Sequence, residues 1–122
     1  MFEVSVESHF DAAHFLREYQ GKCENLHGHR YNVILSIKAR GLDSGGMAYD
    51  FVELKKKLNS VLEQWDHHCL NEVSPFDRIN PSAENIAVTI HKKLRNRLGK
   101  GVSISSIQVW ETPQNRVTYY PD

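Results

Sequence analysis

The side chains best suited to chemistry lie in one short stretch of this sequence, Cys23 to His29. The stretch holds a thiol at Cys23 and two imidazoles at His27 and His29, and it opens a run that is typical of a β-strand. Because side chains along a strand alternate between its two faces, His27 and His29 are expected to point the same way. Two imidazoles on one face can share a small cation. Zinc fits best, because imidazole nitrogen is among its preferred ligands.

A third ligand is available at His14, at the end of the first predicted strand. If the first two strands pair antiparallel, His14 can reach the face of His27 and His29 from across the ladder. Three neutral histidines leave a fourth position open, which is the pattern of a catalytic zinc. Two alternatives stay open at this point. Any single histidine is more often a hydrogen-bonding or half-exposed residue than a ligand, and Cys23 could close a structural site as the fourth ligand.

The length and composition predict one domain, residues 1–122, of an ordinary globular kind. Apolar residues make up 40% and charged residues 25%, and 15 basic residues balance 15 acidic ones. The zero net charge gives no electrostatic reason to expect nucleic acid or an anionic membrane as a partner. No apolar run approaches membrane-spanning length and no secretory pattern opens the sequence, so a cytoplasmic protein with reduced thiols is expected.

The elements that must position these residues follow from the periodicity of apolar side chains. Alternation predicts strands at 2–10 and 29–40, then at 102–110 and 117–120, and the segment 15–26 reads as a loop. Helical spacing predicts one helix from Asp50 to about Trp65 and another from Ser82 to Leu98, ended by glycines. The order β-β-α-α-β-β predicts an α+β fold, with a four-stranded antiparallel sheet and two helices on one of its faces.

Asp66, His67 and His68 follow directly after the first predicted helix. A carboxylate next to an imidazole can hold it in one tautomer and raise its basicity. The alternative is a polar helix terminus, where a protonated histidine is favoured by the helix dipole. From the residues alone, the helix terminus is the commoner arrangement.

Four motifs, in this order, resemble the 6-pyruvoyltetrahydropterin synthase and 6-carboxytetrahydropterin synthase family. They are Phe-x-Ala-Ala-His, Cys-x3-His-Gly-His, Asp-His-His and Glu-Thr-Pro, and the resemblance runs nearly end to end. It implies zinc on His14, His27 and His29. It also implies that Cys23 is a catalytic base rather than a ligand.

The resemblance gives roles to further residues. His67 is implied as a proton relay with Asp66 as its partner, and Glu111 is implied to recognise the 2-amino and ring N–H groups of a pterin, which suits a carboxylate. The stretch from residue 80 to residue 85 resembles one that contributes to the pterin pocket. Within it, Ser82 keeps a hydroxyl of the family pattern and Ala83 loses one.

The resemblance also implies the tunnelling (T-) fold, whose subunits join sheet edges into a barrel. The expected assembly is a homo-oligomer, a trimer or a dimer of trimers, with active sites between subunits. Edge pairing would also remove exposed strand edges, which is a physical reason to assemble.

The expected activity is a zinc-dependent lyase that converts 7,8-dihydroneopterin triphosphate to 6-carboxy-5,6,7,8-tetrahydropterin, with loss of acetaldehyde and triphosphate, on the route to queuosine and other 7-deazapurines. Two alternatives within the family are a 6-pyruvoyltetrahydropterin synthase and a side-chain cleavage that yields a 6-hydroxymethyl-dihydropterin for folate. Glu24, directly after Cys23, keeps the last of these open. An alternative from another class is a non-enzymatic module with a structural zinc.

Overall fold

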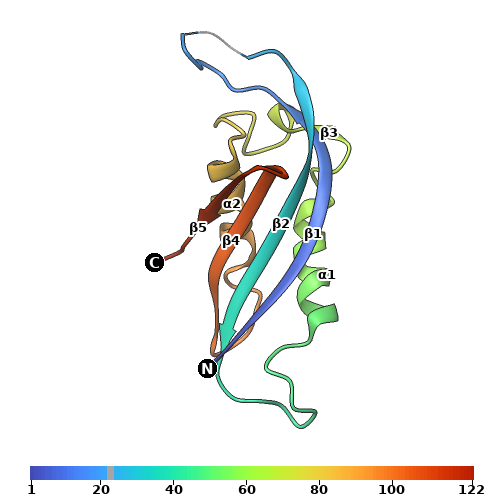
Figure 1. The fold of residues 1–122 in the computed structure, drawn as a ribbon, viewed down its shortest axis with the longest axis vertical. Helices are drawn as coiled ribbons and strands as arrows, with labels where there is room; N and C mark the ends of the chain where they lie inside the picture. Colours follow the sequence, from blue (N-terminus) through green and yellow to red (C-terminus); the bar gives the residue numbers. More distant parts are fainter. Residues whose placement is uncertain (22–23) are drawn as a thin grey trace.

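Two long antiparallel strands, β1 (Phe2–His14) and β2 (His27–Ala39), form the middle of the sheet (Figure 1). The structure, a computed structural model, describes residues 1–21 and 24–122. Both strands are longer at the functional end than the alternation predicted, so the ladder continues until His14 lies opposite His27. This extension carries the three candidate ligands on paired backbone rather than in a loop.

The sheet has five strands in the order β3-β1-β2-β4-β5. β4 (Val102–Thr112) pairs antiparallel with β2, and β5 (Asn115–Tyr119) pairs antiparallel with β4. The expectation of four antiparallel strands was therefore wrong by one element, because β3 (His68–Cys69) pairs parallel with β1. A strand of two residues is too short to show an alternating pattern, and it forms only because the preceding chain brings it to the free edge of β1.

One face of the sheet is apolar and packs against the helices. The even positions Phe10, Ala12 and His14 of β1 are buried on this face, and Tyr31 and Val33 of β2 join them. The intervening side chains of β1 point to the other face, as the period of two requires. The candidate ligands therefore lie at one end of the helix-covered face.

Both helices begin where the sequence predicted. Asp50 caps α1 (Phe51–Leu62) by accepting the N–H of Val52, and Ser82 caps α2 (Ala83–Leu94) by accepting the N–H of Asn85. Such caps stabilise a helix by about 1 kcal/mol each. In the described part of the chain, no helix is long and apolar enough to cross a membrane.

Both helices end earlier than the apolar spacing predicted. After Leu62 the chain tightens into turns, with Trp65 N–H donating to Leu62 O (3.0 Å), and His67 takes a left-handed conformation (φ 61°) directly before β3. Trp65 and Leu98 are buried as expected, but from turns rather than from helices. Apolar spacing continued beyond both helices because the core continues there.

Candidate metal centre and substrate cleft

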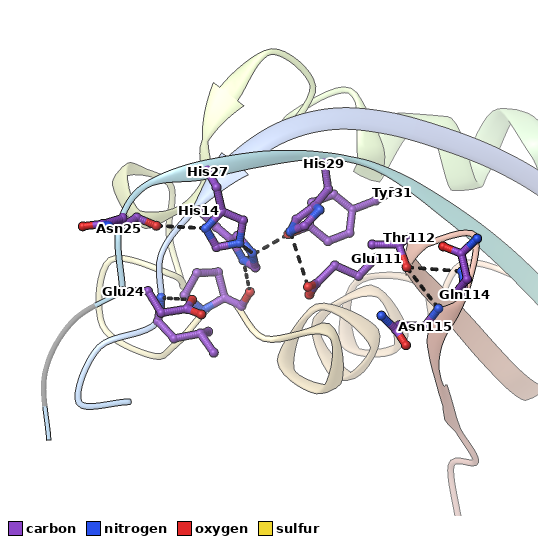
Figure 2. A network of polar contacts seen from close by, with 12 residues as sticks. His14, Glu24, Asn25, His27, His29, Tyr31, Glu111, Thr112, Gln114 and Asn115 are labelled. Atoms are coloured by element: carbon purple, nitrogen blue, oxygen red, sulfur yellow. Dashed lines mark hydrogen bonds and ion pairs between the residues drawn. The ribbon is translucent and has the colours of Figure 1, made fainter. Parts of the chain in front are cut away.

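The structure brings His14, His27 and His29 together at the end of the β1–β2 ladder (Figure 2). The centroids of their rings are 4.7 to 5.1 Å apart, and the Nε2 atoms of His14 and His27 are 3.2 Å apart. One ligand atom from each, with a carboxylate oxygen of Glu111, lies within 4.8 Å of all the others. Strand alternation and pairing predicted that the three histidines lie together, and they do. That they bind a metal stays a prediction.

The outer nitrogens of two of these rings are fixed by backbone carbonyls. His14 Nδ1 lies 2.8 Å from Pro81 O, and His27 Nδ1 lies 2.9 Å from Asn25 O. A carbonyl oxygen only accepts, so each Nδ1 carries a proton, and the neutral form of each ring then has its lone pair at Nε2. Two lone pairs facing each other at 3.2 Å repel unless a cation lies between them. This donor set fits a metal ion, and imidazole nitrogen suits zinc.

The third ring completes the group. Among the described residues, the buried Nε2 of His29 has no hydrogen-bond partner, although Glu111 Oε1 lies 3.3 Å away. Burial lowers the pKa of His29, against the opposing influence of Glu111. The imidazole is therefore kept neutral, which is the form that binds a metal.

Tyr31 is a member of this group that the sequence analysis missed. Its hydroxyl oxygen lies 3.0 Å from His14 Nδ1, beside the contact of that nitrogen with Pro81 O. Burial raises the pKa of Tyr31, so the hydroxyl is neutral at physiological pH. The sequence held a signal that could have identified it: Tyr31 shares the face of His29 two residues along β2, and a buried tyrosine usually has a polar partner.

A cleft of about 190 Å³ is lined by Glu111, whose Oε1 lies 3.3 Å from His29 Nε2, and so reaches the histidine group through this residue. Glu111, Ser82 and Ala83, which the sequence analysis assigned to substrate binding, all line it, together with Leu16. Ser82 and Ala83 are here because α2 begins at the cleft, whereas Glu111 comes from the end of β4. The structure thus places Ser82, Ala83 and Glu111 on the walls of the same cleft. Their contact with a pterin stays a prediction.

The Asp66–His67 pair forms a second, separate polar group. His67 Nδ1 lies 2.9 Å from Asp66 Oδ2. Backbone bonds fix the pair to β1, since Asp11 N–H donates to Asp66 Oδ1 (2.9 Å) and His67 N–H donates to Asp11 O (2.6 Å). The Asp11 N–H holds the pKa of Asp66 below its usual value, so the carboxylate is charged and can orient the imidazole.

The two groups lie on different sides of β1. His14 belongs to the helix-covered face, whereas the side chain of Asp11, three residues earlier, points to the other face and accepts two hydrogen bonds from Arg30. Asp11, Asp66 and His67 also lie close enough to share an ion, but Arg30 already engages the Asp11 carboxylate and the Asp11 N–H engages that of Asp66. We therefore interpret the Asp66–His67 pair as a histidine oriented by a carboxylate, and not as a metal site.

Three further residues singled out in the sequence are Cys23, Glu24 and His68. Cys23, the predicted base, lies outside the described residues. Glu24 lies beside the cleft, where its carboxylate accepts the N–H of Leu16 (3.0 Å). His68 is exposed, and its Nδ1 lies 2.8 Å from Asp66 O, so it supports the turn after α1.

Comparison with known proteins gives one family. Residues 3–122 match the family model for 6-pyruvoyl tetrahydropterin synthase. A 6-carboxy-5,6,7,8-tetrahydropterin synthase of Haemophilus influenzae is 35% identical over 98% of this chain and 99% of that protein. A dihydroneopterin monophosphate aldolase of Pyrococcus furiosus is 34% identical over 88% of each chain. The structure of a Caenorhabditis elegans 6-pyruvoyl tetrahydropterin synthase superposes with a TM-score of 0.82 at 29% identity, over 100% of this chain and 98% of that one. The expected fold class is thus confirmed.

Proposed function

This chain belongs to the 6-pyruvoyl tetrahydropterin synthase family, and within it we propose a zinc-dependent lyase that converts 7,8-dihydroneopterin triphosphate to 6-carboxy-5,6,7,8-tetrahydropterin, releasing acetaldehyde and triphosphate. The observation that carries the proposal is the set of three imidazoles beside a cleft that ends at Glu111. The Haemophilus influenzae relative supports this choice of product among those of the family.

In the proposed enzyme, His14, His27 and His29 hold the zinc. The metal supplies Lewis-acid chemistry, which lowers the cost of negative charge on oxygen atoms of the substrate side chain. The protein's part is to aim one nitrogen of each ring at the metal. The carbonyls of Pro81 and Asn25 fix the tautomer and orientation of two rings, and burial favours the neutral form of His29.

Glu111 is proposed to orient the substrate. Its carboxylate is one-third exposed at the wall of the cleft, so it can accept the 2-amino and ring N–H groups of a pterin as a pair of charge-assisted hydrogen bonds. Cys23 is proposed as the base that removes a proton from the substrate side chain, and Asp66 holds His67 to relay protons.

We propose that an active site is assembled from two or more copies of the chain. Within one chain, the histidines His14, His27 and His29 (the metal group) and the Asp66–His67 pair form separate clusters on different sides of β1, which supports a pairing between chains. The side chain of His67 is 78% exposed, which leaves it accessible to a neighbouring subunit. A closed ring of subunits would bring the pair of one chain to the cleft of another.

Product analysis by mass spectrometry tests the activity. Zinc-loaded protein is incubated with 7,8-dihydroneopterin triphosphate, and we expect 6-carboxytetrahydropterin together with acetaldehyde. A 6-pyruvoyl product would contradict the proposed product and keep the family chemistry. Absence of turnover at full zinc occupancy would contradict the enzyme.

A second candidate is side-chain cleavage to a 6-hydroxymethyl-dihydropterin. The aldolase of Pyrococcus furiosus and the presence of Glu24 favour it. The geometry of Glu24 does not, because an oxygen of its carboxylate is engaged by the N–H of Leu16. The same mass spectra separate the two, since the 6-hydroxymethyl product has its own mass.

Removal of the metal separates an enzyme from a structural zinc module. With the metal chelated, we expect an inactive protein that keeps its circular dichroism spectrum and its assembly, since the core of the sheet and helices does not depend on the histidines. Unfolding on chelation would support a structural zinc instead.

A further inference from the structure

We propose that residues 15–17 form a rigid wall of the substrate cleft, and that Glu24, Asn71 and Asn80 are the positioning residues that hold it. This segment directly follows His14, and its middle residue, Leu16, lines the cleft. Each of the three positioning residues satisfies both backbone groups of one residue in the segment. The proposal rests on the proposed function for its catalytic consequence, although the clamp itself can be tested without it.

Asn71 holds the first residue. Its Oδ1 accepts the N–H of Phe15 at 3.0 Å, and its Nδ2 donates to Phe15 O at 3.0 Å. Asn71 is only 7% exposed and comes from the short helix η1 (Leu70–Glu72) that follows β3. A side-chain amide that donates and accepts in this way takes the place of a neighbouring strand.

Asn80 holds the third residue by the same pairing. Its Oδ1 accepts the N–H of Arg17 at 2.7 Å, and its Nδ2 donates to Arg17 O at 3.0 Å. Asn85, in α2, donates to Asn80 O at 2.8 Å, which ties the clamp to the helix. The guanidinium of Arg17 also donates to the carbonyls of Phe76 and Ile79. Both the backbone and the side chain of Arg17 are therefore bound to the loop at residues 73–80.

Glu24 holds the middle residue from the opposite branch of the loop. Its Oε1 accepts the N–H of Leu16 at 3.0 Å, and its own N–H donates to Leu16 O at 2.9 Å. The chain then turns at Glu18, whose left-handed φ of 57° needs support from surrounding contacts. Three consecutive residues outside the sheet thus have every backbone N–H and C=O engaged.

The consequence concerns geometry at the reacting atoms. Because the segment connects a metal ligand, His14, to the wall residue Leu16, any slack in it displaces the substrate relative to the metal group. Catalytic groups need positions accurate to about 0.5 Å, and small misplacements reduce rates by about 10²-fold. Glu24 acts here through its oxygen as an acceptor, which requires neither a negative charge nor a proton transfer.

Two substitutions at Glu24 separate a clamp from a base. Glu24→Gln keeps the side-chain oxygen for the Leu16 N–H and removes the charge, whereas Glu24→Ala removes this acceptor and keeps only the backbone bond to Leu16 O. We expect Glu24→Gln to keep kcat within about 3-fold of the wild type and Glu24→Ala to lower it about 10- to 100-fold, both with full zinc content. Loss of kcat in both variants alike would overturn the positioning role and make Glu24 a base.

Amide hydrogen exchange in the zinc-loaded protein tests the clamp without any substrate. Exchange at Leu16 should accelerate in Glu24→Ala and stay at the wild-type rate in Glu24→Gln. If the wild type turns over no pterin but Leu16 responds in this way, the proposed function is contradicted and the clamp stands. If Leu16 exchanges equally fast in both variants and the wild type, the clamp is overturned whatever the activity.

Asn80 provides an independent test with a matched control. Asn80→Asp keeps an acceptor for the Arg17 N–H but replaces the donor with an oxygen that faces Arg17 O, so we expect faster exchange at Arg17 and a lower kcat. Asn96→Asp, the same change at an exposed asparagine beyond α2, should alter neither. Unchanged exchange at Arg17 in Asn80→Asp would overturn this arm of the clamp.

Discussion

The metal group and the Asp66–His67 pair are both anchored on β1, yet they are built in opposite ways. His14 is 2% exposed and its ring is fixed by a backbone carbonyl, whereas the side chain of His67 is 78% exposed and is fixed by a carboxylate. The first group is directed inward to the helix-covered face and has three convergent nitrogens. The second lies at the outer edge of the sheet.

This difference in burial indicates which of the two groups finds all its hydrogen-bond partners within one chain. A buried group needs its partners within the fold, because an unpaired polar atom away from water is costly, and the metal group has them except at the nitrogens where an ion belongs. An exposed pair needs no such completion, since water satisfies it. The Asp66–His67 pair is therefore suited to act on something that arrives from outside the chain.

The largest expected effect comes from removing one member of each group. His14→Ala should lower zinc affinity by at least about 100-fold and abolish activity, because the variant loses a ligand from a group of three. His67→Ala should lower activity by about 10²- to 10⁴-fold and leave zinc content unchanged, since it loses only proton transfer. Zinc content by elemental mass spectrometry and turnover rates measure both.

A control sits on the same strand. His9→Ala removes an exposed histidine of β1 and should change neither zinc content nor turnover. Full zinc content in His14→Ala would break the assignment of the metal group, and zinc loss in His67→Ala would break the separation of the two groups.

Mixing the two inactive variants sharpens the comparison. If each site takes its histidines from one subunit and its Asp66–His67 pair from another, random assembly of equal amounts of His14→Ala and His67→Ala restores about one quarter of the sites. Turnover after unfolding and refolding the mixture together measures the recovery, with each variant refolded alone as the control. No recovery in a mixed oligomer would show that one chain supplies both groups.

A smaller effect is expected at Tyr31, which supports the metal group from behind His14. Tyr31→Phe keeps the packed ring and removes the hydroxyl next to His14 Nδ1, so zinc affinity should fall by about 10-fold. Competition with a zinc chelator measures the affinity. Tyr119→Phe, on β5, serves as the control, and equal affinities in both variants would remove Tyr31 from the group.

The smallest effect concerns acid and the Asp66–His67 pair. The pKa of Asp66 is lowered in the folded protein, so this carboxylate stabilises the fold above the unfolded value of about 3.9 and loses that contribution as pH falls through its folded pKa. The wild type should therefore melt above Asp66→Asn at pH 6, and the gap should close as the pH falls toward 3. A gap that widens in acid would contradict the role of the Asp11 N–H as the support of Asp66.

Sequence reasoning reached the metal group because its logic is periodic. His27 and His29 are two apart on one strand, and His14 lies on the strand that pairs with it, so alternation and antiparallel pairing were enough to predict their proximity. The helix starts were equally local, since Asp50 and Ser82 cap their own helices.

Other features depended on contacts that no local pattern records. The strand β3 exists only because the chain after α1 reaches the edge of β1, and the clamp on residues 15–17 joins asparagines that lie more than fifty residues away in the sequence. Glu24 shows the difference most clearly. Its position after Cys23 kept open a role as a second base, whereas its hydrogen bonds with Leu16 indicate a support.

By itself the sequence determined the kind of fold, the family and the set of imidazoles that could share a metal, because these follow from side-chain periodicity and from ordered motifs. Only the tertiary structure decided which nitrogens present lone pairs, which carboxylates are already engaged, and that the Asp66–His67 pair faces away from the metal group. Those properties depend on distances between segments far apart in the chain, and such distances exist only after the core has packed.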